Sequence, residues 1–71
     1  MRIVRVQVKF FALTKGYGFL VSPEIDGDIF VHATALKLDG WTHLKPFQEF
    51  IAEVERGPKG WQAYRLHEQN S

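Results

Sequence analysis

Four rings recur at every second position in two short stretches of the chain: Tyr17, Phe19, Phe30 and His32. Side chains two residues apart point to the same face of a β-strand, so each stretch, if extended, carries its two rings on one face. Pairing of the two strands would bring all four rings into one surface. Exposed rings next to lysines suit single-stranded nucleic acid, because every base has a π-face that can stack.

A hydrophobic core is the alternative use for these rings, and three observations favour exposure. The opposite strand faces already supply apolar residues, and a buried His32 ring or Tyr17 hydroxyl would need hydrogen-bonding partners. The first twenty residues carry basic side chains and no acidic ones, so the formal net charge of +1 conceals an asymmetry along the chain that favours a polyanionic partner. The candidate core residues are Val4, Val6, Val8, Leu20, Ile29 and Val31, and the basic residues are Arg2, Arg5, Lys9 and Lys15.

The scaffold for these rings must be built from 71 residues. We expect one domain over residues 1–71, with an ordered core at about residues 3–67. The chain has no cysteine, which excludes disulfides and thiolate metal sites and favours a reducing compartment. It lacks the apolar run of about 20 residues that a membrane helix needs and the apolar stretch of a secretory signal. We therefore expect a cytoplasmic protein without a membrane partner. We also expect it to be a monomer.

Alternation of apolar and polar residues predicts five strands. They lie at residues 4–10, 17–21, 28–33, 47–55 and 61–66, with a short helical turn at 34–37, a hairpin loop at 22–27, a long loop at 38–46 and a turn at 57–60. The fourth segment also has apolar residues at helical spacing, but Phe, Ile and Val prefer strands, and Pro46 and Gly57 bound the segment tightly. Five short strands predict a small barrel or sandwich, and a closed barrel leaves no exposed edge.

Four segments in order resemble motifs of one family. Residues 15–20, Lys-Gly-Tyr-Gly-Phe-Leu, resemble the first ribonucleoprotein-type motif of the cold-shock domain, and residues 29–32, Ile-Phe-Val-His, resemble the second. Residues 8–11 are similar to the family's Val-Lys-Trp-Phe opening, and residues 57–63 to its Gly-Pro-Lys-Gly-Pro-Gln-Ala loop. The resemblance covers the chain from Val4 to Leu66.

The resemblance implies an all-β fold, a small five-stranded antiparallel Greek-key barrel of the oligonucleotide-binding (OB) type. It implies binding of single-stranded RNA and single-stranded DNA, with a role as RNA chaperone or transcription antiterminator. Matched by position, the binding residues are Lys9, Phe10, Phe11, Lys15, Tyr17, Phe19, Phe30, His32, Trp41, Lys59 and Gln62.

The chain departs from the family pattern at four positions. Phe10 stands where the family has Trp, which keeps a stacking ring but loses the indole N–H donor. Ala12 replaces an Asn, and Ala33 replaces a Phe, so that one stacking ring is missing. Trp61 replaces a Pro, and we expect it to restore a ring near the site, which adds Trp61 to the predicted binding residues.

Phe10 and Phe11 pose a conflict between pattern and resemblance. Strict alternation puts Phe10 with Val8 on one face and Phe11 with Lys9 on the other, whereas the resemblance implies that both rings reach the site. A β-bulge near Phe11 or Ala12 would reconcile the two.

Other chemistries have weaker support. The histidines His32, His43 and His67 lie far apart and no cysteine accompanies them, which does not fit a zinc site. Glu53 and Glu55 share a strand face, but a solvated outer face explains them. We expect no catalysis, no metal, no cofactor and no small-molecule substrate. The alternative function is a β-barrel interaction module that binds an apolar or proline-rich peptide. Salt separates the two functions, because nucleic-acid binding weakens steeply as salt rises.

Overall fold

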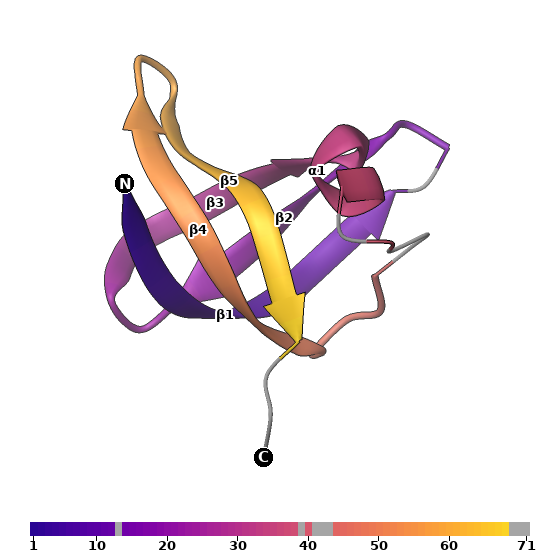
Figure 1. Ribbon diagram of the computed structural model, residues 1–71, viewed down its shortest axis with the longest axis horizontal. Coiled ribbons are helices and arrows are strands. Elements are labelled where there is room, and N and C mark those ends of the chain that lie inside the picture. Colours follow the sequence, from indigo (N-terminus) through magenta and orange to yellow (C-terminus); the bar gives the residue numbers. More distant parts are fainter. Residues whose placement is uncertain (13, 39, 41–43, 69–71) are drawn as a thin grey trace.

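Five β-strands form the closed barrel drawn in Figure 1, and a short helix follows the third strand. This computed structural model describes residues 1–12, 14–38, 40 and 44–68. The strands are β1 (Arg2–Ala12), β2 (Tyr17–Ser22), β3 (Ile25–His32), β4 (Glu49–Gly57) and β5 (Gly60–Glu68), and the helix is α1 (Ala33–Leu38). All five predicted strands and the predicted helical turn are therefore confirmed, and the helical alternative for the fourth segment is wrong.

The strands neighbour one another in the order β1-β2-β3-β5-β4, and β4 closes the ring by pairing with β1. Four of these pairs are antiparallel, but β3 and β5 run parallel. The predicted five-stranded OB-type barrel is confirmed, with mixed strand directions rather than antiparallel pairing throughout, and the reason is geometric. Alternating directions cannot close around an odd number of strands, so one neighbouring pair must be parallel. The architecture is otherwise that of an OB-type barrel.

The barrel interior is filled by inward-pointing residues of every strand, which alternate with outward ones except at the irregularities of register. Val4, Val6 and Val8 of β1 point inward, as the alternation predicts, and β4 contributes Phe50 and Ala52. The complete core of the described residues is Val4, Val6, Val8, Leu20, Ile25, Ile29, Val31, Ala35, Leu36, Leu44, Phe50, Ala52, Val54, Ala63 and Leu66. Two of these residues come from α1, which lies at one end of the barrel (Figure 1). This core forms without the four rings at 17, 19, 30 and 32.

The hairpin between β2 and β3 differs from the predicted loop. Its turn consists of Pro23 and Glu24, and β3 already begins at Ile25. Between the pairs Leu20↔Ile29 and Ser22↔Ile25, residues 26–28 of β3 oppose one residue of β2. The Asp-Gly signal at 26–27 therefore marks an irregularity within a strand, where Gly27 adopts φ 91°. Glycine at positive φ serves bulges as well as turns, which is why the sequence pattern misplaced the loop.

The described helix α1 has six residues. Within residues 1–12, 14–38, 40 and 44–68, no helix has the length and apolar character to cross a membrane.

Candidate nucleic-acid interface

Five rings gather on the outer face of β1, β2 and β3, and we call them the ring surface: Phe10, Tyr17, Phe19, Phe30 and His32. Strand register explains the cluster, since Phe10 pairs with Phe19, Phe19 pairs with Phe30, and Tyr17 pairs with His32. Contacting ring centroids lie between 5.5 and 6.4 Å apart. The four rings predicted to share a face therefore do so, and Phe10 joins them.

The ring surface is open to solvent rather than packed into the core. Phe10 is 42% exposed, His32 is exposed, and the other three rings are half-buried. The imidazole of His32 is held by the start of α1, because its Nδ1 accepts the Thr34 backbone N–H at 3.2 Å and lies 3.1 Å from the Thr34 hydroxyl. The alternative in which these rings form the core is contradicted by their exposure.

A β-bulge at Lys9 decides which ring of β1 faces outward. Val8 pairs with Leu20 and Phe10 pairs with Phe19, so Lys9 is an extra residue in β1. Phe10 consequently turns to the ring surface, while Phe11 packs against the core. The predicted bulge exists, but it precedes the predicted position. Because alternation resumes after the bulge, Phe10 and Phe11 lie on opposite faces of β1, and the half-buried Phe11 does not join the ring surface.

Gly18 makes the close packing of β1 on β2 possible. It pairs with Phe11, and a Cβ placed on it would lie 2.7 Å from Phe11 Cδ1 and still closer to the Phe10 carbonyl oxygen. Only a residue without a side chain fits between these two strands.

The predicted separation of charges is not maintained in space. Lys9 Nζ lies 3.1 Å from Asp28 Oδ2, and the Arg5 backbone N–H donates to Glu24 Oε2 at 3.3 Å. The acidic residues follow the first twenty in the sequence, but β3 folds back beside β2 and brings them next to β1. Lys15 and Lys59 are exposed in the β1–β2 and β4–β5 turns.

The β4–β5 turn borders the ring surface. A hollow of about 580 Å³ is lined by Phe19, Phe30, Gly57, Pro58, Lys59, Gly60, Trp61 and Gln62. Gln62 pairs with Phe30 across the parallel β3–β5 ladder. The structure therefore brings the predicted residues Lys59, Trp61 and Gln62 together with two of the rings.

Arg2 is a residue of this region whose contact the sequence did not reveal. Its guanidinium carbon lies 5.7 Å from the centroid of the Trp61 ring, in cation–π range. Trp61 also packs against the core. The two residues lie far apart in the sequence and meet only because the barrel closes, so the sequence pattern could not predict this contact.

The remaining predicted positions lie elsewhere. Trp41 and His43 fall outside the described residues. His67 Nε2 lies 2.6 Å from Glu53 Oε2 on the outer face of β4 and β5. The described ranges contain no group of three or more His, Cys, Asp or Glu residues arranged to hold a metal ion.

Comparison with known proteins decides the family. Residues 4–69 match the model described as the 'Cold-shock' DNA-binding domain. The chain belongs to the cold-shock domain family. It is 45% identical over 56 residues to the cold shock-like protein CspD of Vibrio cholerae, covering 79% of this chain and 74% of that protein. It is 43% identical over 60 residues to a cold shock-like protein of Thermotoga maritima, covering 84% and 89%. For the major cold shock protein CspA of Bacillus cereus the identity is 42% over 57 residues, covering 80% and 84%.

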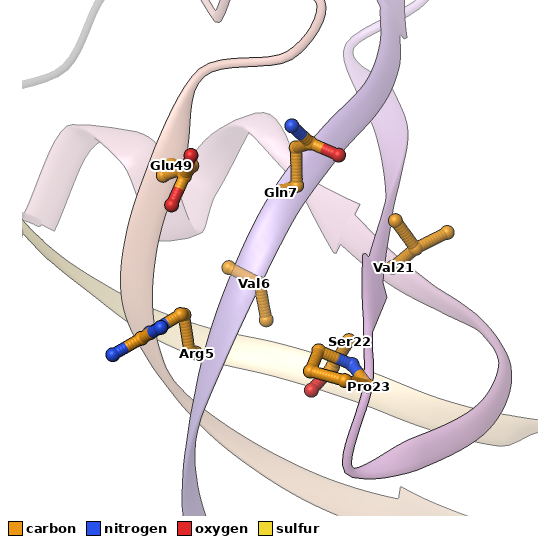
Figure 2. A pocket seen from close by; sticks show the side chains of 7 residues that line it. All are labelled: Arg5, Val6, Gln7, Val21, Ser22, Pro23 and Glu49. Atoms are coloured by element: carbon orange, nitrogen blue, oxygen red, sulfur yellow. The ribbon is translucent and has the colours of Figure 1, made fainter.

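Membership in the cold-shock domain family supports nucleic-acid binding in general, and the ring surface carries accessible aromatic rings. A different hollow, of about 230 Å³, lies between β1, the end of β2 and the start of β4, and Figure 2 labels the side chains that line it. Its lining is Arg5, Val6, Gln7, Val21, Ser22, Pro23 and Glu49, which includes no aromatic ring. This hollow of the cold-shock domain therefore offers no aromatic ring on which a base could stack.

Proposed function

We propose that this cold-shock domain binds single-stranded RNA and single-stranded DNA by stacking unpaired bases on the ring surface. The observation that carries the proposal is a continuous set of five contacting, solvent-accessible rings on a barrel whose core is complete without them. Each stacked base contributes about 1–3 kcal/mol, with little dependence on sequence. A double helix hides its base faces, so paired strands bind much more weakly.

Three lysines supply the electrostatic part of the binding. Lys15 and Lys59 are exposed on two turns, and they contact backbone phosphates. Lys9 leaves its ion pair with Asp28 and contacts a phosphate instead. This exchange costs little, because both side chains of the pair are about half exposed and such pairs contribute only about 0–1 kcal/mol to stability. The hollow beside Lys59 receives a base between Trp61 and Phe30, and Gln62 offers an amide to the edge of that base.

The biological role follows from preference for unpaired strands. Binding of the open form shifts weak RNA hairpins toward that form by mass action, which is the action of an RNA chaperone and of a transcription antiterminator. No bond is made or broken in this process, and no cofactor takes part. The cytoplasmic location and the monomeric state stay predictions.

A titration with single-stranded oligothymidine at two salt concentrations tests the proposal. We expect quenching of tryptophan fluorescence and an affinity that falls as salt rises. The slope of log K against log salt concentration should be about −0.7 for each phosphate contacted. A duplex of the same length serves as the control and should bind far more weakly. The absence of oligothymidine binding, or tight salt-insensitive binding of a proline-rich peptide instead, would contradict the proposal.

A further inference from the structure

Phe47 occupies a turn position that normally belongs to glycine. The Gln48 N–H donates to the Lys45 carbonyl at 3.2 Å, which closes a four-residue turn with Pro46 and Phe47 at its centre. Phe47 has φ 71° and is the only residue other than glycine with positive φ in the described ranges. Proline at the second position and positive φ at the third position are the features of a type II turn. Glycine is the preferred residue at that third position. A bulky residue in this conformation strains the backbone.

Packing of the side chain does not offset this strain. Phe47 is 78% exposed, the highest value among the large apolar residues that the structure describes. Its backbone is nevertheless fixed: its N–H donates to the Val8 carbonyl at 2.8 Å, and its carbonyl accepts from Gln7 Nε2 at 3.4 Å. The chain therefore holds a ring in solvent, on a rigid base, at a cost to its own stability.

The position of Phe47 connects it to the ring surface. Its hydrogen-bonding partner Val8 directly precedes the bulge residue Lys9, which turns Phe10 outward. The turn flanks β1 on the side opposite β2. It therefore lies on the β4 side of β1, and its bonding partner Val8 is two residues before Phe10 in that strand.

We propose that Phe47 is a further base-stacking position, at the edge of the ring surface beyond Phe10. The inference rests on the proposed function. The occupant is a nucleobase, because an exposed ring whose backbone is bonded to Val8, the residue before Lys9, offers a base one stacking face near a cation. One side chain buries far less area than a specific protein contact requires.

A length series of single-stranded oligothymidines tests this position. The wild-type protein should gain affinity with each added nucleotide until its last stacking position is filled. We expect Phe47→Gly to bind short oligonucleotides like the wild type but to miss the last gain, so that the longest bind about five- to tenfold more weakly. Its thermal midpoint should be higher than that of the wild type, because glycine adopts positive φ without strain.

Three further variants separate stacking from other effects. Phe47→Leu keeps apolar bulk and backbone strain, so it should melt like the wild type but bind like Phe47→Gly. Phe47→Trp keeps a ring, so it should retain affinity and add a fluorescence signal that is quenched only by the longer oligonucleotides. Ile3→Ala removes an exposed apolar side chain outside the ring surface and should change neither binding nor its length dependence.

The outcomes distinguish this inference from the proposed function. If the wild type binds no oligothymidine of any length, the proposed function fails. If the wild type binds and Phe47→Gly matches it at every length, only the Phe47 inference is overturned. A lower thermal midpoint with weaker binding at every length would also overturn it, because Phe47 would then support the fold.

Discussion

Lys9 is a single extra residue in β1 that determines the chemistry of its neighbours. It keeps Val8 buried and turns Phe10 outward, while Phe11 packs against the core. Without the bulge, Phe10 would continue the inward row that contains Val6 and Val8. A stacking ring and a cation thus become adjacent on the outside of the barrel, at the cost of one unpaired ladder position.

Trp61 is the residue whose contribution to binding is most directly measurable. We expect Trp61→Ala to weaken oligothymidine binding about tenfold, because one stacking ring beside Phe30 is lost. The variant should also lose about 2 kcal/mol of unfolding free energy, since the indole packs partly on the core. Fluorescence anisotropy of a labelled oligonucleotide measures the binding without relying on tryptophan.

Trp61→Phe is the matched control for that experiment. It keeps a ring in the hollow and should retain most of the affinity, whereas a loss equal to that of Trp61→Ala would show that the indole matters for more than stacking. Unchanged affinity in Trp61→Ala would show that Trp61 does not restore a stacking position.

At the scale of strands, alternation predicted which segments form the barrel and which faces turn inward. This worked because side-chain direction in a strand depends only on sequence period. Alternation did not place the three irregularities of register in the described strands, although the conflict between Phe10 and Phe11 indicated a bulge near the first of them. They lie at Lys9, within residues 26–28 and at Tyr64, where β5 shifts against β4. Each depends on the pairing of one strand with another, which local sequence does not specify. The contact between Arg2 and Trp61 was inaccessible for the same reason.

The tight fit of β2 against the bulged part of β1 gives a prediction about stability. Gly18→Ala should lower the free energy of unfolding by about 1–3 kcal/mol, because the new methyl group meets the Phe10 carbonyl and the Phe11 ring. Thermal denaturation followed by circular dichroism measures the change. Movement of Phe10 should also weaken oligothymidine binding.

Gly57→Ala is the control for that stability measurement. A Cβ at Gly57 has the Gly60 carbonyl oxygen as its nearest neighbour, at an ordinary contact distance of 3.8 Å. Its thermal midpoint should stay close to that of the wild type. Equal destabilisation by both substitutions would contradict the explanation by crowding at the bulge, because only Gly18 is crowded.

For the whole molecule, folding changes the meaning of the charge pattern. Along the chain, basic residues come first and acidic residues follow, but the β2–β3 hairpin returns the acids of residues 24–28 to the side of β1. The electrostatic attraction for a polyanion is therefore weaker than the sequence order suggests. In the binding mode that we propose, stacking on the rings contributes correspondingly more of the affinity, which fits a domain with a formal net charge of only +1.

Asp28→Asn measures how far the acids restrain nucleic-acid binding. It releases Lys9 from its 3.1 Å ion pair, so we expect oligothymidine affinity to rise about fivefold at low salt and the salt dependence to steepen by about 0.7 in log K against log salt. Stability should change by less than about 1 kcal/mol, because the pair is exposed. Asp26→Asn is the matched control: it changes the net charge equally, but Asp26 makes no ion pair with any residue that the structure describes. If release of Lys9 matters, affinity should rise more in Asp28→Asn than in Asp26→Asn, because Lys9 is next to Phe10 in β1. Equal gains in affinity would assign the effect to net charge alone.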